Sequence, residues 1–507
     1  MSQTLDLNAT WTLQDLNAVA KQKAVLRLPS DCLEKVRSSR AFVEKVAADN
    51  DHPVYGINTG FGALAETAIS AGDLKTLQRN LIRSHACGVG PLLSAEVVRV
   101  MLALRAHTLC MGVSGVRAKV IELLVQLYAN DLLPCIPAQG SVGASGDLAP
   151  LAHLALVLMG EGEAMLNGKR LSAKEALART GLEAIELQAK EGLALINGTQ
   201  MMAALGGLAL ADALVLLDSA DVVGAMSLEA YRGSKRPFDP RLHDVRPHPG
   251  QICSAAHLRA LLESSEIMES HRDCDKVQDP YSFRCMPQVH GASRDALSYA
   301  CAVTEREINS ATDNPLIFID EKGQGDAISG GNFHGQPLAL AFDTACMAVA
   351  ELANISERRI EQLVNPALGS GLPAFLAGKV GLESGFMIAQ VAAASLVSEN
   401  KVLCHPASVD SIPSSAGKED HVSMGSISAR KFAQVLEHTQ KVLAIEALVA
   451  AQGLDLRKPL KAGRGVSKAH ESLREHVQGL KGDRPLYRDI ETATQWLRNH
   501  GASHVLS

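Results

Sequence analysis

The sequence predicts a mainly α-helical protein built around a bundle of long helices, with a few short β-ribbons. Three observations lead to this fold class. Ala and Leu recur in long blocks while aromatic residues make up only 4% of the 507 residues, which favours packed helices over β-sandwiches. Helix-start signals recur through the first part of the chain. After residue 198 the apolar stretches become much longer.

Short helices and ribbons are expected in the first part. A Ser or Thr before an apolar run predicts four helices: one after Thr12 with Asp15, one over 95–109 behind Ser94, one over 116–131 behind Ser114 that stops before Pro134, and one from Ser172 with Glu175 to Gly181. Another helix is expected to begin at Asp147, with Pro150 in its first turn. The predicted β-structure is a hairpin turning at Asn167-Gly168 and a ribbon over 316–329, later in the chain.

Long apolar stretches after residue 198 are predicted to be the helices of the bundle. Because they leave little polar face, they must be buried, either in the bundle centre or against another subunit. We therefore predict a homo-oligomer, with a large monomeric bundle as the alternative. The expected division is a loop-rich helical domain over 1–200, and a long-helix bundle with C-terminal helices over 201–507. The stretches are 198–231, 290–311, 337–366, 384–403 and 426–453.

Composition argues against several functional classes. The net charge is −6 and the Lys and Arg residues are scattered, so no nucleic-acid surface is expected. No run reaches the roughly 18 charge-free residues that a membrane span needs. The N-terminus lacks the pattern of a signal peptide. The ten cysteines form no CxxC pair, so neither a metal site nor a disulfide framework is indicated, and a cytoplasmic protein with free thiols is expected.

Long loops rich in Gly, Pro and His separate the helices, and loops of this length are usually functional. Tyr55 opens a glycine-rich loop as either a packed structural residue or a general base. A base would need a lowered pKa, hence nearby cations or hydrogen-bond donors. His85 lies at a helix end, where a C-terminal cap is a commoner role than a ligand. The loops are 52–65, 135–150, 232–255, 273–290, 326–336 and 404–425.

A three-residue spacing relates Gln278, Tyr281 and Arg284. A helical or 3₁₀ turn would point all three the same way. Because a guanidinium matches a carboxylate, the three suit an acid-bearing small molecule. The alternative for Arg284 is an interface ion pair.

Other polar residues have simpler interpretations. Asn197 precedes a long helix, as an N-cap does, and Phe333 is expected to anchor a glycine-flexible loop. His405 and His421 lack the spacing of a metal site, so no metal is predicted.

The tripeptide Ala144-Ser145-Gly146 can become a reagent. A turn can force the Gly146 nitrogen onto the Ala144 carbonyl carbon, because glycine has no Cβ and alanine adds little obstruction. Loss of water closes a five-membered ring, and loss of the Ser145 hydroxyl leaves an exocyclic methylene. The product is a 4-methylidene-imidazol-5-one (MIO) electrophile. A small-residue turn with an N-cap is the alternative, and the residues alone permit either.

Several motifs occur in one order and at one mutual spacing: YGINTGFG (55–62), GSVGASGDLAPLAH (140–153), EGLALINGTQ (191–200), QDPYSFRC (278–285), DNPL (313–316), SGGNFHG (329–335) and SVDSIPSSAGKEDHVSMG (408–425). Over nearly the whole chain they are similar to the aromatic amino acid ammonia-lyase family. The resemblance implies an MIO group formed autocatalytically from Ala144-Ser145-Gly146, with no external cofactor. Further implied roles are Tyr55 as the base for the β-proton, Arg284 as the carboxylate ligand, Phe333 near the electrophile, and Asn197, Gln278 and Tyr281 around the group and the substrate.

The same resemblance implies an ammonia-lyase (fumarase/aspartase-like) helical fold and a homotetramer whose active sites combine loops of three subunits. Members acting on phenylalanine or tyrosine have Phe-Leu or His-Leu in place of Ser84-His85, and Asn-Gln-Asp in place of 418–420. An imidazole has two polar nitrogens that need partners, which His85 and Glu419 can supply. We therefore predict L-histidine as the substrate, with trans-urocanate and ammonia as products.

Three alternatives remain for the function. The nearest is a lyase or aminomutase of the same family that acts on tyrosine or phenylalanine. Gly417-Lys418 stands where several bacterial histidine-specific members have Asn-Gln, so Lys418 could pair with Glu419 and change ring recognition. A fumarase-like lyase would need a GSSxMPxKxN-type signature, which the sequence lacks. A catalytically inactive helical scaffold is the alternative from a different class.

Overall fold

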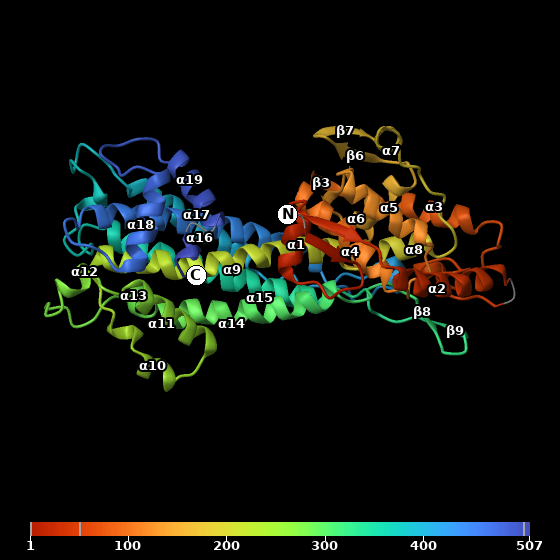
Figure 1. The fold of residues 1–507 in the computed structure, drawn as a ribbon, viewed down its shortest axis with the longest axis horizontal. Coiled ribbons are helices and arrows are strands. Elements are labelled where there is room, and N and C mark those ends of the chain that lie inside the picture. The colour runs from red at the N-terminus through yellow and green to blue at the C-terminus, as the bar shows by residue number, and fades with distance from the viewer. Residues whose placement is uncertain (1–2, 50–51, 500–501, 507) are drawn as a thin grey trace. The chain divides into compact units, whose positions relative to one another are not determined.

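The computed structural model describes residues 3–49, 52–499 and 502–506, and most of its elements are helices (Figure 1). Contacts divide the chain into two compact units. Unit 1 comprises Met1–Leu208, Cys301–Phe342 and Pro406–Arg430, and unit 2 comprises Ala209–Ala300, Asp343–His405 and Lys431–Ser507. The division expected at residue 200 follows chain order, whereas each unit combines three segments, and that division stays a prediction.

Five long helices occupy the predicted apolar stretches: α9 (Gln200–Tyr231), α14 (Met286–Ile308), α15 (Gln336–Val364), α16 (Met387–Leu403) and α17 (Gly425–Asp455). Their bounds agree with the prediction to within four residues. By length and composition alone, α9 and α15 could cross a membrane. Because 67% of the most apolar window of each is buried inside the protein, both also fit the description of core helices.

Unit 1 packs short helices and small sheets around α4 (Ala95–Cys110), which is buried over most of its length. The predicted hairpin is present, and Asn167 and Gly168 have φ angles of 51° and 72° in its turn. The predicted ribbon over 316–329 is β8–β9. The other elements are β1 (Gln3–Asp6), α1 (Leu13–Ala20), β2 (Ala24–Arg27), α2 (Ser30–Ala48), α3 (Leu74–His85), β3 (Val89–Leu92), α5 (Ala118–Ala129), β4 (Leu133–Pro134), β5 (Pro137–Gln139), α6 (Leu148–Leu158), β6 (Glu163–Leu166), β7 (Lys169–Ser172), α7 (Ala173–Thr180), α8 (Glu191–Ile196), β8 (Leu316–Ile319) and β9 (Gly325–Ile328).

Helix starts were predicted well where a side chain caps the backbone. Thr12 forms a full capping box with Asp15, and Ser94 accepts the Val97 N–H. The helix predicted over 116–131 is α5, which begins at Ala118, and its N-cap residue is Arg117 and not Ser114. In place of a serine cap, the backbone N–H and the guanidinium of Arg117 donate hydrogen bonds to the buried Glu191, 2.7 to 3.0 Å away.

Unit 2 contains helices where loops were expected. Within 232–255, α10 and α11 each begin with a proline at the first helical position, where its missing N–H costs nothing. Within 273–290, α13 ends just before α14 begins. The proline content of these segments predicts loops, whereas Pro240 and Pro249 begin helices. The elements are α10 (Pro240–Asp244), α11 (Pro249–Leu261), α12 (Glu266–Glu269), α13 (Tyr281–Arg284), α18 (Arg464–His476) and α19 (Tyr487–Arg498).

Candidate active site

The Ala144-Ser145-Gly146 turn lies in unit 1, just before α6, as predicted from Asp147 and Pro150. Ser145 has a φ of 50° and Gly146 has a φ of 81°, so both are in the left-handed region. A serine there is under backbone strain, and such strain concentrates at functional sites. Ala144 is buried and packs against Val422 and Met424.

A strand-like bridge joins Gly146 to Gly198, which follows α8. The Asp147 N–H donates to the Gly198 carbonyl oxygen at 2.7 Å, and the Gly198 N–H faces the Ser145 carbonyl oxygen at 3.4 Å. A Cβ atom on Gly146 would lie 2.1 Å from the Gly198 carbonyl oxygen. Only glycine fits at position 146, so this peptide nitrogen is as unhindered as the predicted ring closure requires.

Asp147 has a role that the sequence did not reveal. The residue is fully buried, and its Oδ2 accepts the Met202 N–H of α9 at 2.9 Å instead of capping its own helix. Burial raises its pKa to about 7, although hydrogen bonds from the Met202 and Met201 N–H groups lower it. The carboxyl group therefore ties the tripeptide turn to the start of α9.

Glu419 lies beside the tripeptide, and its charge acts on Tyr55. The Ser145 hydroxyl donates to Glu419 Oε1 at 3.5 Å, and the Ser414 hydroxyl donates to Glu419 Oε2 at 2.6 Å. Tyr55 is half-buried, and burial raises the pKa of its phenol, as does the charge of Glu419, while a hydrogen bond from the Gly62 backbone lowers it. The lowered pKa that a tyrosinate base needs is therefore not produced within one chain.

One predicted residue, Asn197, has a different local role from the one expected. Asn197 is the C-cap of α8 and not the N-cap of α9, which begins at Gln200. Its side chain is buried and donates to the Leu193 carbonyl oxygen at 3.3 Å. Between the two helices, Gly198 forms the bridge to Gly146 of the tripeptide turn.

His85 is the last residue of α3, and its Nδ1 lies 2.8 Å from the Leu81 carbonyl oxygen. This is the expected helix-end contact, and it leaves Nε2 without a partner among the described residues. Phe333 is half-buried in the loop before α15, two residues from Gly335, which contacts Met202. His85 is not hydrogen-bonded to Glu419 in the described part of the chain.

The remaining predicted residues belong to unit 2. Tyr281 and Arg284 share the short helix α13, and the guanidinium carbon lies 4.5 Å from the centre of the tyrosine ring. Gln278 precedes that helix and is exposed. Arg284 Nε is buried and has no hydrogen-bond partner among the described residues, so the guanidinium can bind an anion.

Lys418 is exposed in unit 1, and the described residues contain no ion pair between it and Glu419.

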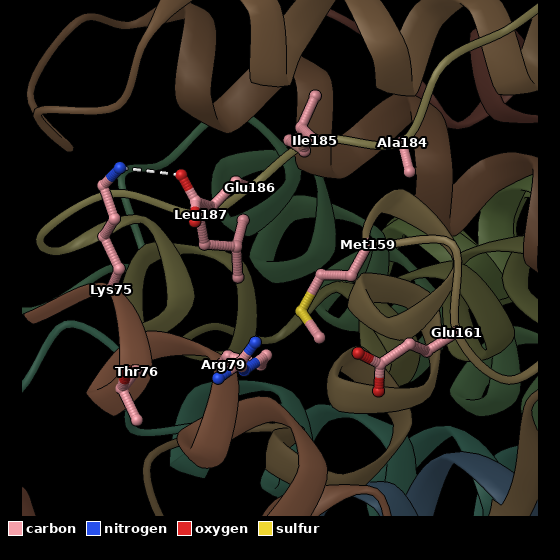
Figure 2. Close-up of a pocket in the computed structure, with 9 residues that line it drawn as sticks. All are labelled: Lys75, Thr76, Arg79, Met159, Glu161, Ala184, Ile185, Glu186 and Leu187. Carbon is pink, nitrogen blue, oxygen red and sulfur yellow. Dashed lines mark hydrogen bonds and ion pairs between the residues drawn. The ribbon is translucent and has the colours of Figure 1, made fainter.

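A pocket elsewhere in unit 1 contains none of the predicted site residues (Figure 2). It lies between α3, the end of α6 and the segment 184–187. Two of its lining residues form an ion pair, in which Lys75 Nζ donates a hydrogen bond to Glu186 Oε2. Among residues 3–49, 52–499 and 502–506, no cluster of three His, Cys, Asp or Glu side chains is placed to hold a metal ion.

Known proteins resemble the chain over nearly its whole length. The family described as "Aromatic amino acid lyase" matches residues 11–475. A histidine ammonia-lyase from Sorangium cellulosum (strain So ce56) is 62% identical over 492 residues, covering 96% of both chains. The crystal structure of histidine ammonia-lyase from Trypanosoma cruzi has a TM-score of 0.91 and 44% identity, covering 100% of this chain and 95% of that one. Tyrosine aminomutase from Streptomyces globisporus has a TM-score of 0.92 and 38% identity, covering 99% and 98%.

Proposed function

The chain belongs to the aromatic amino acid lyase family, and on this premise we propose that it eliminates ammonia from L-histidine to give trans-urocanate. The observation that carries the choice of substrate is 62% identity to a histidine ammonia-lyase over nearly the full length. The fold does not discriminate between the two activities, because the tyrosine aminomutase, at 38% identity, superposes as well as the histidine ammonia-lyase does. Sequence similarity therefore favours the carbon–nitrogen lyase over the aminomutase alternative.

The residues at 144–146 fit an MIO group. Position 146 admits no Cβ, Ser145 is held in a strained left-handed conformation, and Ala144 is fixed by packing. When formed, the group supplies an electrophile that makes departure of ammonia and of a β-proton easier. It is made from the chain itself, so no external cofactor is required.

Polar and charged groups from several loops would hold the substrate. Glu419, next to Ser145, can accept an imidazole N–H, and the free Nε2 of His85 can bind a second polar group of the substrate. Arg284 would bind the substrate carboxylate and Tyr55 would take the β-proton. The raised pKa of Tyr55 in one chain means that its activation would depend on cationic groups of the assembled site.

We further propose a homotetramer in which loops of three subunits form each active site. Tyr281 is 71% exposed although it belongs to the predicted site, as expected for a residue that completes a site on another subunit. Asn197, Gln278 and Phe333 would line the same assembled sites.

The reaction chemistry is tested by Ser145→Ala. Without the serine hydroxyl the exocyclic methylene cannot form, so urocanate formation, followed by its ultraviolet absorbance, should fall by at least about 1,000-fold. The wild-type chain should be lighter than its sequence mass by two waters, about 36 Da, and the variant should lack the second loss.

The control for this test is Ser172→Ala. Ser172 caps α7 and has no described contact with the tripeptide, so this variant should keep its activity and lose only a little stability. A Ser145→Ala variant with wild-type turnover would disprove the proposed chemistry.

Substrate choice is tested by Glu419→Gln. An amide cannot offer two acceptor oxygens to both Ser414 and an imidazole N–H, so kcat/KM for histidine should fall by about 100-fold. Lys418→Gln is the matched control, because its exposed neighbouring side chain should contribute little. Production of coumarate or β-tyrosine from tyrosine, with no turnover of histidine, would favour the alternative substrate.

A further inference from the structure

Arg105 is a fully buried cation in the middle of α4, next to the candidate site. Its Nη1 donates to the carbonyl oxygen of Asn197 and, at 3.0 Å, to Gln200 Oε1. Nε and Nη2 are buried and have no hydrogen-bond partner among the described residues. Burial lowers the pKa of Arg105 to about 10, so the group is still charged near neutral pH.

Within residues 3–49, 52–499 and 502–506, no carboxylate is hydrogen-bonded to this charge. The nearby Asp313 is hydrogen-bonded at 2.7 Å to another buried cation, Lys190, which neutralises it. Burying a charge without such a partner costs several kcal/mol in general. The Asn197 carbonyl oxygen and Gln200 Oε1 are therefore the groups that stabilise this buried charge.

The surroundings fix the direction of the guanidinium. Gln200 Nε2 donates to Thr312 Oγ1 at 2.9 Å and to Thr108 Oγ1 at 3.2 Å, which turns Gln200 Oε1 toward Arg105. The backbone packs directly on this cluster, because a Cβ on Gly198 would lie 2.4 Å from Gln200 Oε1 and 2.8 Å from Arg105 Nη1. The guanidinium and the peptide between residues 197 and 198 form one rigid unit.

That peptide connects the charge to the tripeptide turn. Its carbonyl oxygen, which belongs to Asn197, accepts a hydrogen bond from the Arg105 guanidinium. Its N–H, which belongs to Gly198, faces the Ser145 carbonyl oxygen at 3.4 Å. A cation that donates a hydrogen bond to an amide oxygen draws electron density away from the amide nitrogen. The amide N–H then becomes a stronger hydrogen-bond donor. The positive charge of Arg105 is thus transmitted to the Ser145 carbonyl group.

Negative charge develops on this oxygen when Ser145 is dehydrated. The Cα–H bond and the Cβ–Oγ bond break, the proton and the hydroxide leave as water, and the Cα–H electron pair becomes the Cα=Cβ bond. Before the hydroxide leaves, that pair is shared with the Ser145 carbonyl oxygen. A donor already in place there lowers the barrier.

We propose that Arg105 is a positioning residue for maturation of the tripeptide: through the Asn197–Gly198 peptide it stabilises negative charge on the Ser145 carbonyl oxygen. This inference rests on the proposed function, because it assumes that the tripeptide matures. Its readout is the mass of the chain and does not depend on turnover.

The experiment follows the loss of two waters by mass spectrometry after cell-free synthesis of the full chain. Arg105→Met removes the charge, and we expect loss of water to slow by about 100-fold. Arg105→Lys keeps the charge without the planar fork, and we expect it to mature about tenfold more slowly than wild type. Folding of each variant is checked by circular dichroism and thermal unfolding.

Arg99→Met is the matched control on the same helix. Arg99 binds Asp131 and the Ala20 carbonyl oxygen, so its loss should lower Tm while the chain still becomes lighter by two waters at the wild-type rate. A purely structural role for Arg105 would give the same result as this control.

The outcomes separate the two proposals. A folded Arg105→Met chain that matures at the wild-type rate overturns the role of Arg105 and leaves the proposed function intact. If Arg105→Met does not fold, the neutral polar variant Arg105→Gln decides, and a maturation rate within about twofold of wild type in that folded variant overturns the inference. A wild-type chain that never loses the two waters overturns the proposed function, and the role of Arg105 with it.

Discussion

Two glycines show how single residues set the conditions for chemistry at this site. Gly146 has no room for a Cβ because the Gly198 backbone is too close, Gly198 has none because Gln200, Thr312 and Arg105 surround it, and both glycines have positive φ angles. Their backbone bonds, together with the Asp147 N–H, hold the tripeptide turn against α8 and α9. Backbone contacts between small residues therefore help to hold the reactive geometry.

Gly146→Ala should block maturation. The added methyl group meets the Gly198 carbonyl oxygen at 2.1 Å, and alanine is strained at a φ of 81°. We expect a chain that keeps its full sequence mass and lacks activity. Gly181→Ala also places alanine at a positive φ but meets no atom within 4 Å, so it should lose stability yet still mature. Loss of two waters by Gly146→Ala would contradict the tight fit at this position.

Glu229 in unit 2 predicts a pH dependence of stability. Burial raises its pKa to about 7 from the usual 4.5, although hydrogen bonds from Ser265 and Gly463 lower it. Below pH 4.5 both the folded and the unfolded chain are protonated at this site, and no penalty arises. As the pH rises through about 7 the folded chain must carry a buried charge, so this contribution to stability is lost.

Glu229→Gln removes the buried charge and should therefore raise Tm relative to wild type more at about pH 8 than at about pH 5. Thermal unfolding at both pH values measures the difference. Glu263→Gln, at an exposed carboxylate paired with Arg464, serves as the control and should show no such change with pH. A Tm difference for Glu229→Gln that does not depend on pH would contradict the raised pKa.

At the scale of elements, helix caps depend on nearby residues in the sequence, whereas close crossings of helices depend on residues from distant segments. The caps of α1, α4 and α7 come from residues within a few positions of each helix start. The crossing of α11 and α14 brings together two glycines from separate segments, and a Cβ on Gly291 would lie 2.3 Å from the Gln251 nitrogen. Such backbone-to-backbone contact needs glycine, and nothing in the local sequence announces it.

Gly291→Ala should force α11 and α14 apart. The cost of overpacking is about 1–3 kcal/mol of unfolding free energy, because the nearest atoms belong to rigid backbone. Denaturant unfolding measures it. Gly330→Ala, at a loop position with no atom within 4 Å of the added methyl group, should change stability by less than about 0.5 kcal/mol. Equal stabilities for the two variants would show that the helices can adjust.

At the scale of the whole molecule, exposed apolar residues favour assembly. Ile388, Val391 and Val402 lie on one stripe of α16 and are 66%, 52% and 73% exposed. Exposed apolar stripes of this kind mark interaction sites. A second copy of the chain is the occupant that the proposed tetramer requires.

Val391→Glu should weaken this assembly. A carboxylate buried at a subunit interface carries a large desolvation penalty, so light scattering should show smaller species than the tetramer proposed for wild type, and activity should fall with them. Val25→Glu, at a 53% exposed position on β2, is the control. A four-chain mass for Val391→Glu would place the interface elsewhere.

The sequence by itself determined the helical class, the long helices to within four residues, the two ribbons and the start of α6 after Asp147. These features depend on hydrogen bonds and apolar periodicity within a few residues, which local sequence encodes. The motifs also indicated Ser145 and Glu419, which the structure brings together. Their separation along the chain gave no physical reason to expect that contact.

Only the tertiary structure decided that Asn197 caps α8, that Asp147 caps α9 and not its own helix, and that Arg105 lies behind the Asn197 carbonyl group. In each case a polar group must find a partner once it is buried, and that partner is far away in the sequence or belongs to another element. Local patterns cannot identify such a partner, because packing of the whole unit determines which groups meet.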